Sequence, residues 1–113
     1  MMSEYNPDRW VMLKFTSEKD TNVYKVLAGW GGSYIYGASW KLNSGVTEVE
    51  EDGDYYLFHG YSGSVYRCHK RSYGLTSLTA GVLESFYKEL EEQPVKLVCM
   101  NEDETNFMEL KYV

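Results

Sequence analysis

Histidine and cysteine are the side chains in this sequence that could carry acid–base or nucleophilic chemistry near neutral pH. The histidines are His59 and His69, and Cys68 directly precedes His69. A histidine can take up or release a proton near pH 7, and it can activate a thiol that lies within hydrogen-bond reach. Adjacent strand residues point to opposite faces, so Cys68 and His69 should not meet. His59 and Cys68 are expected in neighbouring strands and could share a face. A small hydrolase-like enzyme using His59 or His69 is therefore one hypothesis, although no third, orienting group can be named.

Residues 54 to 71 interleave cations with aromatic rings. With a two- or four-residue loop at positions 60 to 63, one face would carry Tyr56, Phe58, Val65, Arg67, His69 and Arg71, and the other Tyr55, Leu57, Tyr66 and Cys68. A three-residue loop would exchange the partners. Guanidinium groups beside rings bind phosphate and stack on bases, which favours a protein that binds or sequesters a nucleotide or another phosphorylated small molecule. Alternatively, these cations pair with nearby carboxylates on a solvent-facing sheet.

The segment "GWGGSYIYGASWKLNSG", residues 29 to 45, combines five glycines with Trp30, Tyr34, Tyr36 and Trp40. So many glycines exclude a regular helix, because glycine disfavours helical backbone. Tyrosine and tryptophan among serine, glycine and asparagine are typical of recognition loops, in which rigid rings supply contact area. Tryptophans that close the open end of a small sheet or barrel would give the same composition. The sequence does not decide between a recognition loop and a structural closure.

The charge and the motif content limit the function classes. A net charge of -6 argues against non-specific binding to nucleic acid, which depends on lysine and arginine. No metal-binding, cofactor-binding or catalytic motif is present, so we predict no metal and no cofactor. The chain shows no signal peptide and no apolar run long enough to cross a membrane, which predicts a cytoplasmic protein. Cys68 and Cys99 lie in apolar runs typical of buried free thiols, and whether they pair is open.

The apolar pattern predicts short strands at residues 10–15, 22–28, 33–40, 46–52, 55–59, 64–71, 95–100 and 106–113. Turns are expected at Asp52-Gly53 and at positions 60 to 63. The 95–100 strand is expected to be buried on both faces. One helix is predicted over residues 77–92, where the apolar residues Leu78, Val82, Phe86 and Leu90 recur every fourth position. Gly81 within it suggests close approach to a sheet.

These elements predict one α+β domain over residues 1–113. The expected architecture is an antiparallel sheet or small half-barrel of about six strands, packed against the helix at 77–92. A small sheet with an open edge makes a symmetric homodimer the default oligomer.

Two segments, "AGWGGSYIYGASWKLNSGV" and "YLFHGYSGSVYRCHKRSYGL", resemble small proteins of unassigned function encoded by tailed bacteriophages. The resemblance covers roughly residues 22 to 75 and carries no known catalytic or binding residues. It implies a viral product in the cytoplasm of the host cell, where such proteins bind a host factor or sequester a signal. A virion or scaffold component is a further alternative.

We therefore expect a small, acidic, non-enzymatic phage-type accessory protein that binds a host bacterial protein through an aromatic, glycine-rich surface. The candidate binding residues are Trp30, Tyr34, Tyr36, Trp40, Tyr56, Arg67, His69 and Arg71.

Overall fold

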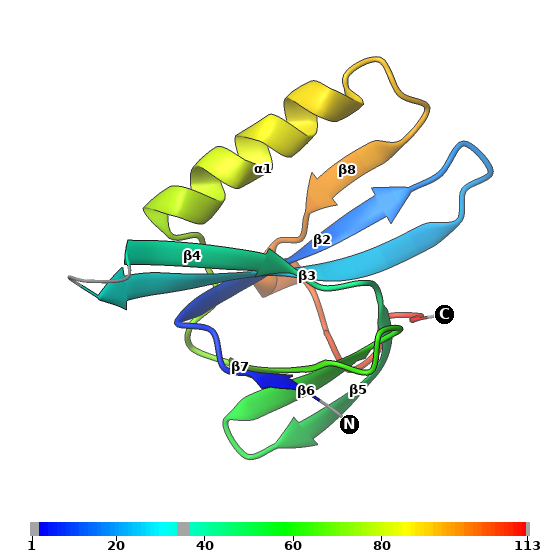
Figure 1. Ribbon diagram of the computed structural model, residues 1–113. Coiled ribbons are helices and arrows are strands. Elements are labelled where there is room, and N and C mark those ends of the chain that lie inside the picture. Colours follow the sequence, from blue (N-terminus) through cyan, green and yellow to red (C-terminus); the bar gives the residue numbers. More distant parts are fainter. Residues whose placement is uncertain (1–2, 34–36, 113) are drawn as a thin grey trace.

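The computed structural model describes residues 3–33 and 37–112, and it shows two small sheets and one long helix (Figure 1). In chain order the elements are β1 (Glu4–Tyr5), β2 (Arg9–Thr16), β3 (Asn22–Ser33), β4 (Gly37–Leu42), β5 (Val46–Asp52), β6 (Tyr55–Gly60), β7 (Val65–His69), α1 (Ser77–Leu90), β8 (Lys96–Cys99) and the 3-10 turn η1 (Glu102–Glu104). The predicted α+β class is confirmed.

The two sheets and the helix form three layers. One sheet has the strand order β4-β3-β2-β8 and the other β1-β7-β6-β5, and all neighbours are antiparallel except β1 and β7. Helix α1 packs on one face of the first sheet, and the second sheet lies on the opposite face (Figure 1). The described residues thus form eight strands where about six were expected, and the two-residue β1 is one of them.

Strand β2 is apolar on both faces because both faces are covered. Trp10 and Met12 point into the core between the two sheets, whereas Val11 and Leu13 point toward α1. All four side chains are almost completely buried. A strand with covered faces reads as a continuous apolar run, which is the pattern of the sequence "WVMLKF".

The core between the sheets is built around the indole of Trp10. Its ring lies 4.8 Å from Tyr73, 5.2 Å from Phe107 and 5.3 Å from Phe58, measured between centroids. The indole N–H donates to the carbonyl of His69 at 2.7 Å, so the polar atom of this buried ring is satisfied. Rings from three segments distant in the sequence therefore meet at Trp10.

Helix α1 begins at Ser77 because Thr76 and Thr79 cap it. The Thr76 hydroxyl accepts the N–H of Thr79 at 3.1 Å, and the Thr79 hydroxyl accepts the N–H of Thr76 at 2.8 Å. This reciprocal pair satisfies two N–H groups that the first turn would otherwise leave unpaired. The helix ends at Leu90, two residues before the predicted boundary.

The C-terminal part of the chain differs from the prediction in two respects. Strand β8 lies at a sheet edge and exposes 45% of Val98, so the expectation of burial on both faces was wrong. Residues 106–112 form turns instead of a strand, because Asn106 accepts the N–H groups of Met108 and Glu109 at 3.1 and 3.0 Å. Phe107 nevertheless fills the core between the sheets, which explains the apolar pattern.

The close approach of helix to sheet occurs at Gly29 of β3 and not at Gly81. A Cβ atom on Gly29 would lie 2.8 Å from Cγ2 of Thr79 and 3.0 Å from Cγ2 of Thr76. Gly81 has open space at its Cβ position and is exposed to solvent. The prediction that Gly81 lies against the sheet was therefore wrong.

Alanine at these two glycines should have opposite effects on stability. Gly29→Ala should lower the free energy of unfolding by about 1–3 kcal/mol, because the added methyl group overpacks the capped end of α1. Gly81→Ala should raise it by about 1 kcal/mol, because alanine is the better helix former. Urea unfolding followed by circular dichroism measures both, and a stability loss for Gly81→Ala would contradict the assignment.

Buried tyrosines predict a loss of stability at alkaline pH. Burial, with smaller contributions from Tyr5 and Cys68, raises the pKa of Tyr66 from 10.0 to about 12. Since the folded pKa exceeds the unfolded one, stability is complete below pH 10 and falls as the pH rises toward 12. Burial also raises the pKa of Tyr73 and Tyr112. Unfolding free energies measured across this window should fall less steeply for Tyr66→Phe, and an unchanged slope would argue against the shift.

Candidate functional site

The aromatic segment of the sequence forms the antiparallel hairpin of β3 and β4. Trp30 pairs with Ser39 and Gly29 pairs with Trp40, so the two tryptophans lie on opposite faces of the hairpin. The Trp30 face turns toward the second sheet, and the Trp40 face turns toward α1. Tyr34 and Tyr36, which were also predicted to bind, lie outside the described residues.

Trp30 is half-buried and is held in place by the N-terminal segment. Its indole N–H donates to the carbonyl of Asn6 at 3.0 Å, and its ring meets Tyr5 edge-on at 6.5 Å between centroids. The ammonium of Lys41 lies 5.0 Å from the centroid of the same Tyr5 ring, within the range of a cation–π contact. Through these contacts the N-terminal segment and the β3–β4 hairpin form one continuous surface.

An open hollow of about 350 Å³ occupies this surface. We call it the aromatic hollow, and its lining residues are Tyr5, Trp30, Ser39, Trp40 and Lys41. Its volume falls at the lower end of the range of small-molecule sites, and it is too open to enclose a ligand. Tyrosine, tryptophan and serine are residue types that recognition surfaces favour.

Trp40 is the most exposed ring of the aromatic hollow, with 41% of its surface accessible. Its indole meets Phe86 of α1 edge-on at 5.9 Å between centroids, which fixes the ring against the helix. A ring that is both exposed and held by packing loses little conformational freedom on binding. Such a residue suits a role as an anchor in an interface.

The glycines of the hairpin serve its backbone geometry. Gly32 has a φ of +78°, and a Cβ atom there would lie 1.7 Å from the carbonyl oxygen of Gly37. Gly31 lies in the bulge between Trp30 and Ser33, and its N–H donates to the Asp8 carboxylate at 2.7 Å. The glycine content that suggested a recognition loop therefore has a structural reason at these positions.

The β6–β7 hairpin has the three-residue loop, so the predicted distribution of side chains over its faces was wrong. His59 pairs with Val65 and Gly60 N–H donates to Ser64 at 3.0 Å, which leaves residues 61–63 in the loop. Tyr56 pairs with Cys68 and therefore belongs to the core face, away from Arg67. An odd loop length exchanges the faces of one strand relative to the other.

The cations of this sheet are engaged by carboxylates and rings. Arg67 donates to Asp52 at 2.9 Å, and its guanidinium lies 4.1 Å from the centroid of the Tyr55 ring. Lys70 pairs with Glu51 and lies over the ring of Tyr56. This arrangement is the alternative in which the basic residues pair with neighbouring acids.

His69 and Arg71 adjoin that network. His69 lies against the ring of Tyr55 at 4.9 Å between centroids, and its Nδ1 accepts the N–H of Arg71 at 3.0 Å. The Arg71 side chain is exposed and forms no ion pair with the described residues. Arg67, His69 and Arg71 do not line the aromatic hollow, which is formed by residues of β1, β3 and β4.

The hypothetical pairing of His59 with Cys68 is contradicted by the strand register. His59 lies on the outer face of its sheet, where its Nε2 faces the Glu50 carboxylate at 2.7 Å. Cys68 lies on the core face with none of its surface accessible, and burial raises the pKa of its thiol well above the usual value. A protonated, enclosed thiol cannot act as a nucleophile.

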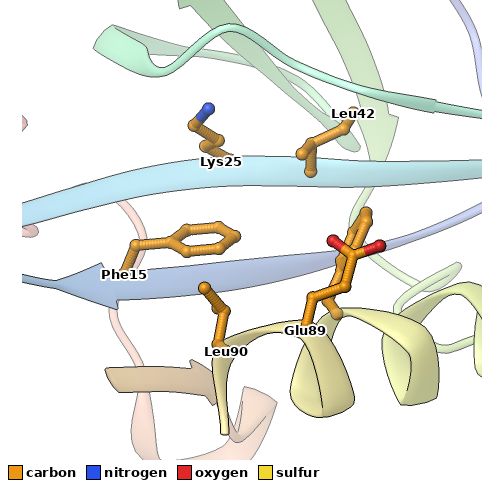
Figure 2. A pocket seen from close by; sticks show the side chains of 6 residues that line it. Phe15, Lys25, Leu42, Glu89 and Leu90 are labelled. Atoms are coloured by element: carbon orange, nitrogen blue, oxygen red, sulfur yellow. The ribbon is translucent and has the colours of Figure 1, made fainter. Parts of the chain in front are cut away.

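A second hollow lies between α1 and the sheet beneath it (Figure 2). Its volume is about 130 Å³, and it is lined by Phe15, Lys25, Leu42, Phe86, Glu89 and Leu90. The ammonium of Lys25 lies 5.7 Å from the centroid of the Phe15 ring. The lining is mostly apolar, and the space would hold no more than one small apolar group.

Sequence reasoning found two of the five residues of the aromatic hollow, Trp30 and Trp40. It missed Tyr5, Ser39 and Lys41. Ser39 and Lys41 share a face with Trp30 because Trp30 pairs with Ser39 across the hairpin, and the sequence pattern did not fix that register. No local pattern could reveal Tyr5, since its position depends on the pairing of β1 with β7.

Neither metal ligands nor a membrane-spanning helix can be identified in residues 3–33 and 37–112. No group of three or more His, Cys, Asp or Glu side chains in these ranges is arranged to hold a metal ion. Helix α1 is not long and apolar enough to cross a bilayer. Comparison of the chain with protein-family models, curated proteins and solved structures gives no match.

Thiol labelling tests the environments of the two cysteines. Iodoacetamide at mildly alkaline pH should modify Cys99 before Cys68, because Cys99 is only half-buried whereas Cys68 must await unfolding. Mass spectrometry of the native protein over time follows both sites, and denaturant should equalise their rates. Fast native labelling of Cys68 in a Cys99→Ser variant would contradict its burial.

Proposed function

We propose that this chain is a non-enzymatic accessory protein of the phage type, which binds a protein of the bacterial host in the cytoplasm through the aromatic hollow. The single observation that carries the binding role is the exposed ring of Trp40, packed on Phe86, at the border of a hollow that Tyr5, Trp30 and Lys41 also line. The phage and host assignment rests on the resemblance of residues 22 to 75.

The chemistry of the aromatic hollow favours a protein partner over a small ligand. Its open shape would leave a small molecule largely in water, whereas a partner protein could contact both the hollow and the exposed Trp40 side chain at its border. Interfaces concentrate their binding energy in tryptophan and tyrosine side chains, and a cation at the border contributes less. Lys41 supplies the cation, with its ammonium directed at a ring and not at a carboxylate among the described residues.

A phosphate-binding role has less support. It depended on Arg67 and Arg71 acting together, and Asp52 already neutralises the Arg67 guanidinium while Tyr55 covers it. Releasing Arg67 for a phosphate would leave the Asp52 carboxylate without its partner. The cost of that exchange lowers any gain from the new pair.

Capture from bacterial lysate tests the proposed function. The immobilised wild-type chain should retain a discrete host protein, and Trp40→Ala should weaken its retention by at least about ten-fold, the loss expected at a hot spot. Quantitative mass spectrometry of the eluate gives the ratio. Lys41→Ala should reduce retention less, because a cation at the rim of an interface contributes less than a ring that becomes buried on binding.

Tyr87→Ala provides the matched control. Tyr87 is an aromatic side chain on α1 with 42% of its surface exposed, close to the value for Trp40, and it does not line the aromatic hollow. Its removal should leave capture unchanged. Equal losses for Tyr87→Ala and Trp40→Ala would show non-specific adhesion, and retention that survives Trp40→Ala would reject the proposed site.

A further inference from the structure

The exposed edges of the two sheets differ in how they are protected against pairing with another strand. Edge strand β1 has two residues, and β8 has four and follows closely after Pro94. Edge strand β5 carries the acidic residues Glu48, Glu50, Glu51 and Asp52. Short length, proline and charge are the usual means by which proteins block edge pairing.

Strand β4 carries little of this protection. It has six residues, of which only Lys41 is charged, and residues 37–41 are all exposed. Its neighbour on one side is β3, and it lies at the end of its sheet. No described strand pairs with its other edge, so the backbone groups there are available to another strand.

The register identifies which backbone groups of β4 point outward. The N–H of Asn43 donates to the carbonyl of Val26 on β3 at 2.9 Å. Strand residues alternate in the side to which their N–H and C=O groups point, so Lys41 and Ser39 also face β3. The backbone groups of Ala38, Trp40 and Leu42 therefore face away from the sheet.

We propose that two copies of this chain form a symmetric dimer by pairing antiparallel along β4, with Trp40 of one copy opposite Trp40 of the other. Ala38 then lies opposite Leu42, and Ser39 lies opposite Lys41. The two four-stranded sheets join into one continuous sheet around a two-fold axis. This inference goes beyond the proposed function and does not depend on it.

Charge and backbone conformation select this register over its neighbours. A shift of the axis to Lys41 would place the two ammonium groups directly opposite each other, which is unfavourable. A shift to Ser39 would recruit Gly37, whose φ of +69° lies outside the extended region. With the axis at Trp40, neither conflict arises.

The same comparison favours β4 over β5 as the site of self-pairing. Antiparallel pairing of two β5 strands about Val49 would set Glu48 of one copy opposite Glu50 of the other, twice per dimer. Pairing along β4 sets each Lys41 opposite an uncharged serine. It also sets the small Ala38 beside the larger Leu42, which allows the side chains on the α1 face to interdigitate.

The dimer would change the aromatic hollow. Ser39 lines that hollow, and Lys41 of the second copy would lie opposite it on the same face. Each hollow would then have a cation from both copies, and two hollows would lie side by side across the axis. A partner protein with repeated or two-fold symmetric binding segments would gain affinity from engaging both.

Sedimentation equilibrium of the purified chain, over a range of micromolar concentrations at low salt, tests the dimer directly. The wild-type chain should associate reversibly to twice its monomer mass. Ser39→Lys should raise the dissociation constant about ten-fold, because it places like charges opposite each other at two symmetric positions. Ser39→Glu should lower it by a similar factor through pairing with Lys41, and added salt should reduce both effects.

A second pair of variants tests the backbone pairing. Ala38→Pro removes an outward N–H without removing a bond to β3, so it should abolish dimerisation and leave the monomer folded. Ala38→Thr adds a side chain similar in size to that of proline but retains the N–H, so this variant should still dimerise. Circular dichroism of each variant verifies its fold.

Three results would overturn the dimer. They are a wild-type chain that stays monomeric at all concentrations, Ser39→Lys and Ser39→Glu that shift the dissociation constant in the same direction, and a folded Ala38→Pro variant that dimerises like the wild type. A monomeric chain whose lysate capture is lost in Trp40→Ala would overturn the dimer and leave the proposed function standing. A chain that dimerises but captures no host protein would overturn the proposed function and leave the dimer standing.

Discussion

The burial of β2 on both of its faces is the constraint on which the rest of this structure depends. Met12 and Trp10 fill the core between the sheets, while Val11 and Leu13 fill the core beneath α1. Because one strand supplies both cores, the helix and the second sheet must lie on opposite sides of it. Strand β3 also contributes side chains to both cores. Its hairpin partner β4 lies at the edge of the sheet, with β3 as its neighbour among the described strands.

The exposed chemistry follows from that position at the edge. Gly29 allows α1 to approach β3 closely, and the helix then holds Trp40 through Phe86 while leaving much of the ring in solvent. On the other face, Tyr5 reaches Trp30 because β1 pairs with β7 of the second sheet. The aromatic hollow therefore needs all three layers, and the free backbone of β4 lies along its border. Recognition and self-association would share one strand.

Sequence reasoning succeeded where the pattern was local and failed where it depended on pairing. The α1 helix was found from its four-residue apolar repeat, and the β5–β6 turn from Asp52-Gly53. The β6–β7 faces were exchanged because one residue of loop length reverses every side chain of a strand, so Tyr56 was assigned to the wrong face. Residues 106–112 have strand-like composition, but asparagine turns decide their backbone and leave Phe107 as a plug for the core.

The sequence by itself determined the α+β class, the helix, most of the strands and the net negative charge. These properties depend on composition and on periods of two and four residues, which the chain carries locally. Only the tertiary structure decided that Arg67 pairs with Asp52, that Tyr5 completes the aromatic hollow, and that β4 ends its sheet. Those outcomes depend on which distant strands become neighbours, and that is set by the free energy of burying both faces of β2 at once.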